Sequence, residues 1–276
     1  RCCGQRIIPL PINAQRTQLL ALLDQYHQLG IAQQVDYDKF YLYSLITHST
    51  AIEGSTVTEV ENQLLFDDDL PARGRSMQEL LMNLDLRRAY EQSRRWAALH
   101  IDITPDRLRE LAALVMRNTG ATYNTLAGSF DAAAGDLRLV NVTAGAGGAS
   151  YLHYLKVPAR LDAFCTWLNA ERKKLLAQGD AVQQYALSFE AHLRLVTIHP
   201  WVDGNGRMAR LLMNHLQWEC GLLPSKVDHH NKAAYIEALV AARQTESPQP
   251  FLDFMFEEHI GNLRDEIDTF RQSQEG

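Results

Sequence analysis

Apolar residues recur at intervals of three or four along most of this chain, which is the spacing of an amphipathic helix. The clearest apolar stripe covers 180–198 and contains Val182, Tyr185, Ala186, Phe189, Leu193 and Val196. Similar stripes and end signals predict helices over about 13–30, 36–53, 58–66, 76–99, 104–118 and 249–272. Further helices are predicted after Pro158, after Gly206 and around Tyr235. The chain is therefore predicted to be helical over most of its length.

The helical spacing stops between residues 120 and 150. Glycines gather there, at Gly128, Gly135, Gly145, Gly147 and Gly148. Within this region, residues 137–142 alternate weakly between apolar and polar, like a short strand. The pattern as a whole predicts an all-α fold that contains one small β-hairpin.

The loop between two predicted helices, residues 197–210, combines the residue types of an anion site. Gly204 and Gly206 lack a Cβ, so the backbone can approach a ligand closely there. The helix that follows presents free N–H groups and a positive dipole end. Arg207 and Arg210 lie three residues apart, hence on one face of the first turn. Their guanidinium groups fit phosphate oxygens bidentately.

Two further residues of this loop suggest chemistry on a phosphate. Asp203 is a hard oxygen ligand that could share Mg²⁺ with phosphate oxygens. His199 has an ordinary pKa near neutrality, which suits a general base. From the residues alone, two interpretations stay open: a nucleotide-phosphate site, or an ordinary glycine turn between two helices with a structural histidine.

Residues 199–210, HPWVDGNGRMAR, resemble the signature of the Fic family, HPFx(D/E)GNGRxxR. Every functional position is matched, and the one departure is Trp201 at the position of the family's Phe. That side chain is expected to pack inward, so the exchange changes core volume more than chemistry. The resemblance implies the Fic-type helical bundle, all-α with a small β-hairpin flap.

The resemblance also implies transfer of AMP from ATP, with Mg²⁺ as the metal, to a Ser, Thr or Tyr hydroxyl of a target protein. His199 would accept the proton of that hydroxyl, and Asp203 would hold Mg²⁺. The phosphates of ATP would lie on Gly204, Asn205, Gly206, Arg207 and Arg210. Tyr235 would line the pocket for the nucleotide base, although a core position fits it equally well.

The end of the predicted helix 36–53 carries a second family motif. Ser49-x-x-x-Glu53-Gly54 resembles the inhibitory motif (S/T)xxxE(G/N) that accompanies many Fic domains. The resemblance implies that Glu53 pairs with Arg210, on the guanidinium that the γ-phosphate needs, and that Ser49 holds the helix end. Formation of a homodimer that buries or frees this helix is left open as a means of control.

Three regions follow from these motifs. Residues 1–75 would form an N-terminal helical segment with the inhibitory helix at about 36–54. Residues 76–245 would form the Fic core, with its flap at about 137–151, where the backbone of a target protein adds as a strand. Residues 246–276 would form a C-terminal helix packed on the core.

Three alternatives to AMP transfer stay open. The same site could remove AMP, with Glu53 orienting water, as in some relatives. It could transfer UMP, phosphocholine or a γ-phosphate, but the last is tied to loss of a glycine that is present here, in Gly204-Asn-Gly206. In an alternative from a different functional class, the chain could be a nucleotide-sensing regulator with little turnover. Such a sensor would not need His199.

Net charge and composition restrict which classes of binding partner and which compartment are expected. The net charge of −6 argues against general nucleic-acid binding. Apolar runs of about 18 residues are missing from the sequence, so a membrane span is not expected. Cys165 and Cys220 sit in apolar helical patterns and are expected to be reduced, which favours the cytoplasm. Cys2 and Cys3 are assigned no role.

Adjacent His229 and His230 raise the question of a metal site. Their spacing is wrong for two ligands on one helix face, and neighbouring cysteines are lacking. The sequence therefore does not favour a metal at this position.

Overall fold

The computed structural model describes residues 12–144 and 148–275. Within them the chain forms ten α-helices and one two-stranded sheet, which confirms the predicted all-α class. The α-helices are α1 (Ile12–Gln28), α2 (Tyr37–Ile52), α3 (Glu59–Asp68), α4 (Met77–Ala98), α5 (Pro105–Val115), α6 (Val157–Gln178), α7 (Ala181–Ile198), α8 (Asn205–Glu219), α9 (Lys232–Gln244) and α10 (Gln249–Glu275). The first residues of the predicted N-terminal segment, 1–11, lie outside the description.

Side chains at the helix starts explain several boundaries. Thr58 and Glu61 form the reciprocal capping box expected from the sequence at the start of α3. The same arrangement begins α4, and Asp180 with Gln183 begins α7. Each box provides hydrogen bonds for N–H groups that have no partner inside the helix.

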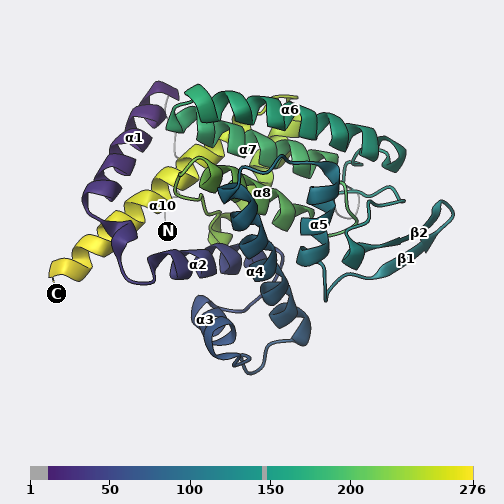
Figure 1. The fold of residues 1–276 in the computed structure, drawn as a ribbon, viewed down its shortest axis with the longest axis horizontal. Coiled ribbons are helices and arrows are strands. Elements are labelled where there is room, and N and C mark those ends of the chain that lie inside the picture. Colours follow the sequence, from purple (N-terminus) through teal and green to yellow (C-terminus); the bar gives the residue numbers. More distant parts are fainter. Residues whose placement is uncertain (1–11, 145–147, 276) are drawn as a thin grey trace, which may run out of the picture.

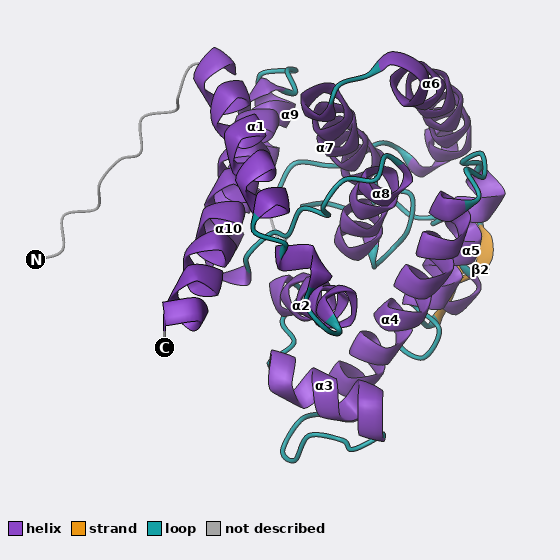
Figure 2. Ribbon diagram, turned by 60° about the vertical axis from the view of Figure 1, so that its left-hand side comes forward, coloured by secondary structure: helices purple, strands orange, loops and turns teal. Residues whose placement is uncertain are grey.

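The pair formed by α7 and α8 lies at the centre of the molecule, as Figures 1 and 2 show. One face of α7 packs into a core shared with α2, α4, α5 and α6, and its other face packs into a second core shared with α1, α9 and α10. Because α7 and α8 are covered on both sides, the loop that joins them, residues 199–204, is held at a fixed place.

Helix α2 crosses beside this pair and is buried along nearly its whole second half, as its all-round apolar pattern predicts. Its end is also held by polar side chains of α3 and α4. Thr50 donates to Oδ1 of Asn83 at 2.8 Å, and the amide of Asn62 donates to the same oxygen at 2.9 Å. Asn83 in turn donates to Ser55, just beyond the helix. Buried networks of this kind fix a single position of a helix end.

The regular hairpin lies earlier in the chain than predicted. Strands β1 (Thr122–Thr125) and β2 (Gly128–Asp131) pair antiparallel and project from one end of the molecule in Figure 1. The prediction of a strand over 137–142 was wrong. The backbone N–H of Arg138 donates to the carbonyl of Pro200 instead of to a neighbouring strand. Between 142 and 151 the described residues form one isolated antiparallel bridge, Thr143 with Ser150. Backbone hydrogen bonds from Ala144 to Ala149 and from Tyr151 to Val142 flank it.

The C-terminal helix α10 packs against α1, α9 and α7 (Figure 1). Its buried side includes Phe251, Met255, Ile260, Leu263 and Ile267. It thus joins the N-terminal helix to the central pair. In the described part of the chain, none of the helices has the length and apolarity that crossing a membrane requires.

Candidate active site

The loop after α7 begins with His199 in the left-handed backbone region, at φ 53°. Its Nδ1 lies 3.1 Å from the carbonyl oxygen of Val196. A ring nitrogen that faces a carbonyl carries the proton, so Nε2 is left as the basic nitrogen. Burial lowers the pKa of His199 to about 4, assisted by the nearby charges of Arg138 and Arg243. The imidazole is therefore neutral at pH 7 and ready to accept a proton.

Two residues that the sequence analysis did not single out hold this histidine in place. The ring of Tyr151 stacks on the imidazole, with centroids 3.8 Å apart. Arg138 is almost completely buried and donates from Nε to the carbonyl of His199 at 2.7 Å. The same guanidinium donates to the carbonyls of Val140 and Leu152, and so ties both ends of the predicted flap to the loop.

The Gly204-Asn205-Gly206 turn starts α8 and points the N-terminus of that helix at the site. Gly204 has φ 80°, and a Cβ there would lie 2.9 Å from Sδ of Met116. The side chain of Asn205 is turned inward, exchanging hydrogen bonds with the backbone of Trp201 at 2.9 and 3.1 Å. Asn205 thus fixes the shape of the turn, and any ligand contact would come from its backbone N–H.

Arg207 is buried without a full set of partners. Its Nη2 contacts Sδ of Met116 at 3.3 Å and lies 3.5 Å from Oδ1 of Asp203. Its Nε and Nη1 are buried and have no hydrogen-bond partner among the described residues. A buried cation with unpaired donors is costly in a folded protein unless an anion binds it.

Arg210 is equally buried, but each of its three nitrogens has a hydrogen-bond partner. Its Nη2 donates to Oε1 of Glu53 at 2.5 Å and to the carbonyl of Ser49 at 3.0 Å. Its Nε donates to Oγ of Ser49 at 2.8 Å, and its Nη1 to the hydroxyl of Tyr235 at 3.2 Å. The structure therefore brings Ser49 and Glu53 onto Arg210, as the inhibitory motif implies.

The carboxylate of Glu53 lies over the turn that starts α8. A Cβ added to Gly206 would lie 2.5 Å from Oε1 of Glu53. Burial alone would raise the pKa of Glu53, but the charges of Arg210 and Arg207 lower it below its ordinary value. Glu53 is thus an anion bound at the N-terminus of α8, in the place suited to a phosphate.

Tyr235 is buried beside Arg210, which agrees with the core position considered for it. Its ring is 2 % exposed, and its hydroxyl lies between Arg210 and Nε2 of His192, 2.9 Å from the latter. Burial and the charge of Arg210 keep His192 neutral by lowering its pKa. In this position Tyr235 supports Arg210 from the side opposite Ser49.

Asp203 is the exposed member of the site. Its Oδ1 accepts from the N–H of Gly204 at 2.6 Å, and its side chain is 63 % exposed. Proteins commonly hold Mg²⁺ by one or two carboxylates together with substrate phosphates and water. A single exposed carboxylate beside Arg207 fits that donor set.

A cleft of about 580 Å³ opens beside His199, between α6, α7 and the end of α9. Tyr151, Ile198 and Arg243 line it, so it reaches the stacked pair of Tyr151 and His199. Arg243 lies over the Tyr151 ring at 4.5 Å. The cleft is wide enough for a side chain or short peptide segment to approach the histidine.

Comparison with known proteins agrees with this geometry. The Fic/DOC family model matches residues 102–217. Protein adenylyltransferase Fic of Drosophila melanogaster is 27% identical over 254 residues, which is 88% of this chain and 45% of that protein. Protein adenylyltransferase fic-1 of Caenorhabditis elegans is 24% identical over 86% of this chain and 43% of its own length. The chain thus spans less than half the length of these relatives.

Solved structures show the same fold. A Fic domain containing signaling protein from Bacteroides thetaiotaomicron has a TM-score of 0.74 at 20% identity, covering 92% of this chain and 97% of that one. Residues 134–508 of Fic-1 from C. elegans give a TM-score of 0.73 at 22% identity, covering 95% and 74%. The matched loop, the helical bundle and these relatives all agree with the match of residues 102–217 to the Fic/DOC family model.

Proposed function

We propose that this chain is an autoinhibited protein adenylyltransferase, which transfers AMP from ATP to a hydroxyl side chain of a target protein. The observation that carries the proposal is the contrast between two buried arginines on α8. Arg207 has unpaired donors, whereas Arg210 is occupied by Glu53 and Ser49. A site with one arginine prepared for an anion and a second one covered by a carboxylate is a phosphate site held in an inhibited state.

The hydroxyl oxygen of the target attacks the α-phosphorus of ATP, forming a P–O bond, while the bond to the β-phosphate breaks and pyrophosphate leaves. The hydroxyl proton passes to Nε2 of His199, which is basic because its Nδ1 faces the carbonyl of Val196. The N–H groups at the start of α8 and the Arg207 guanidinium hold the phosphate chain. Bound Mg²⁺, held by Asp203, would neutralise phosphate charge.

Glu53 inhibits by position and by charge. While it is bonded to Arg210, that guanidinium cannot take the γ-phosphate, and its carboxylate repels a polyphosphate at the same helix end. Release therefore requires α2 to move or Glu53 to rotate away. The cleft beside His199 is the place where we expect the target hydroxyl to enter.

Autoradiography with α-³²P-labelled ATP and Mg²⁺ tests the proposal, because self-labelling needs no identified target. Glu53→Gly should label strongly, the wild type weakly, and Glu53→Gly combined with His199→Ala not at all. An unlabelled Glu53→Gly variant that still binds ATP would exclude self-AMPylation. Release of AMP from a modified protein, abolished by Glu53→Gly, would instead identify the removal reaction.

A further inference from the structure

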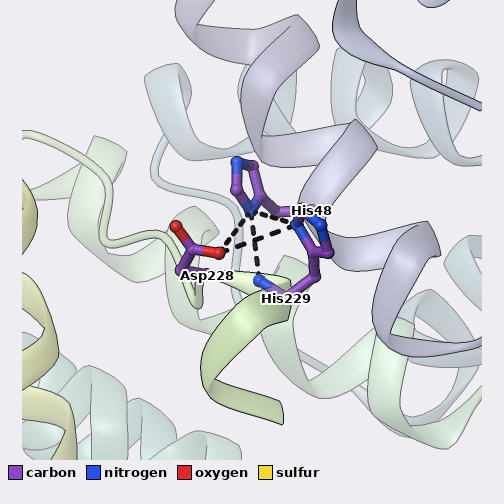
Figure 3. Close-up of side chains that lie close together, drawn as sticks. All are labelled: His48, Asp228 and His229. Carbon is purple, nitrogen blue, oxygen red and sulfur yellow. Dashed lines mark hydrogen bonds and ion pairs between the residues drawn. The ribbon is translucent and has the colours of Figure 1, made fainter. Parts of the chain in front are cut away.

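Three side chains of metal-ligating type converge where α2 meets the turn before α9 (Figure 3). His48 comes from α2, and Asp228 and His229 come from the start of the short 3₁₀ turn His229–Asn231. One ligand atom of each lies within 4.8 Å of the others. The sequence could not show this cluster, since His48 and His229 are 181 positions apart.

The ligand atoms form a triangle of suitable size for a small ion. Nδ1 of His48 and Nδ1 of His229 are 3.1 Å apart. Oδ1 of Asp228 lies 3.5 Å from the first and 3.6 Å from the second. Tetrahedral Zn²⁺ with bonds of about 2.0–2.1 Å places its ligand atoms about 3.3–3.4 Å apart, whereas octahedral geometry at the same bond length needs about 2.9 Å. The mean of the three distances between ligand atoms therefore fits the tetrahedral arrangement.

The surroundings of His48 leave its Nδ1 able to bind a cation. Its Nε2 faces Oε1 of Glu59 at 3.3 Å, and that carboxylate fixes the proton on Nε2. Nδ1 is then a bare acceptor, and it accepts the backbone N–H of His229 at 3.2 Å. A metal ion would replace this hydrogen bond and the one between Nδ1 of His48 and Nδ1 of His229. A carboxylate behind a histidine is the usual outer partner of a metal-binding imidazole.

The charge around the cluster favours a cation. Besides Asp228, the carboxylate of Glu59 stands behind His48, and Glu258 accepts the backbone N–H of Asp228 at 2.7 Å. Lys226 is the opposing charge nearby, 3.3 Å from Oγ of Ser44. The side chains of His48, Asp228 and His229 are 11, 28 and 38 % exposed, so an ion can enter from solvent and keep one water ligand.

We propose that His48, Asp228 and His229 form a binding site for a divalent transition metal of the Zn²⁺ class, with water as the fourth ligand. The ion would join α2 to the segment that leads into α9. His48 directly precedes Ser49, and α9 carries Tyr235, so both walls of the Arg210 site would be tied together. This effect on inhibition rests on the proposed function, whereas the binding of the ion does not.

Zinc binding is measured directly with the purified full chain, by competition with a chromogenic chelator and by metal analysis after dialysis. All proteins carry Cys2→Ser and Cys3→Ser, so that the N-terminal thiols cannot bind the ion. We expect about one Zn²⁺ per chain, and binding at least about tenfold weaker in His48→Gln and in His229→Gln. Glu59→Gln should weaken binding about 10-fold to 100-fold, because it removes the outer partner of His48.

Two control variants separate this site from others. His27→Gln removes an exposed imidazole on α1, outside the cluster, and Asp203→Ala removes the carboxylate of the candidate active site; both should keep the bound Zn²⁺. Co²⁺ should give the strong visible absorption of four-coordinate geometry in the wild type and lose it in His229→Gln. Because His229 is partly exposed, this variant tests the site even if His48→Gln fails to fold.

Absence of Zn²⁺ binding, or equal binding by the wild type and both histidine variants, overturns the proposal and leaves a cluster held by hydrogen bonds alone. Weak, six-coordinate Co²⁺ absorption would also overturn it. The effect on inhibition is read separately, as the ratio of self-labelling with and without Zn²⁺ in the wild type and in His229→Gln. If the wild type binds Zn²⁺ but labels itself equally with and without it, the metal site stands and its proposed effect on inhibition is excluded.

Discussion

Oε1 of Glu53 lies 2.5 Å from Nη2 of Arg210, although the two residues are 157 positions apart in the chain. The contact joins the end of α2 to the first turns of α8. It covers one of two arginines and leaves the other, Arg207, with unpaired buried nitrogens. In the structure, the anion held beside the N-terminus of α8 is the carboxylate of Glu53.

Ser49 should contribute to inhibition through its hydroxyl. Ser49→Ala removes the acceptor for Nε of Arg210 and loosens the hold on α2, so self-labelling should rise about 3-fold to 10-fold, the equivalent of about one hydrogen bond. Ser44→Ala is the matched control on the same helix, since its hydroxyl bonds Glu59 and not Arg210. Equal labelling by both variants would show that the Ser49 hydroxyl has no such role.

Arg207 should contribute to the affinity for ATP and not to the stability of the fold. Its buried, partly unpaired guanidinium is costly in the ligand-free chain, so Arg207→Met should leave the midpoint of thermal unfolding unchanged or raise it. The same change should weaken ATP binding about tenfold or more, because charge-assisted hydrogen bonds to phosphate are lost. Arg194→Met, on the exposed face of α7, should leave ATP binding unaltered.

Glycines at the two ends of α8 allow a matched test of steric contact with an added Cβ. Gly204 and Gly221 both have left-handed backbones, at φ 80° and 68°. A Cβ at Gly204 would meet Met116, whereas nothing lies within 4 Å of a Cβ at Gly221. Both alanine variants bear the strain of about 1 kcal/mol, and Gly204→Ala should lose about 1–3 kcal/mol more free energy of unfolding in urea titration. Equal losses would contradict a close contact with Met116.

Stability should fall as the pH drops below about 6.5, the ordinary pKa of histidine. Burial lowers the folded-state pKa of His199 and His215 to about 4, of His259 to about 3, and of His192 below its ordinary value. The unfolded chain then binds more protons than the folded one, and each histidine subtracts up to about 1.4 kcal/mol per pH unit. Denaturant titrations between pH 5 and 7 should show this slope.

His259 gives that pH dependence a specific test. Neither ring nitrogen has a hydrogen-bond partner among the described residues, so a nonpolar replacement loses no bond. His259→Leu should flatten the slope of stability against pH by about one proton. His27→Gln, an exposed position on α1, should leave the slope as it is in the wild type. A slope unaltered by His259→Leu would place the proton uptake elsewhere.

The sequence predicts most of this fold because the helices carry local signals. The apolar stripe of α7 and the capping residues of α3 are readable at short range, and both are formed in the structure. The β1–β2 hairpin escaped prediction since its strands are short and mostly exposed, and so lack an apolar alternation. The strand expected at 137–142 does not form, because the backbone N–H and the side chain of Arg138 donate hydrogen bonds to carbonyls of the loop after α7.

The site could be predicted only where a motif marks it. The loop residues and Ser49 with Glu53 were predicted from their resemblance to family patterns. Arg138 and Tyr151 were missed, because an arginine or tyrosine in a glycine-rich segment carries no spacing signal. The contact of Tyr235 with Arg210 depends on how α9 packs, which periodicity does not determine.

Affinity for ATP is the most direct measure of the central claim, that Glu53 occupies the Arg210 site against the nucleotide. Calorimetric titration compares the wild type with Glu53→Gln, which keeps the shape of the side chain and removes its charge. ATP must displace a charge-assisted hydrogen bond of about 1.5–3 kcal/mol in the wild type, so we predict binding about 10-fold to 100-fold tighter in Glu53→Gln. Equal dissociation constants for the two proteins would contradict the account.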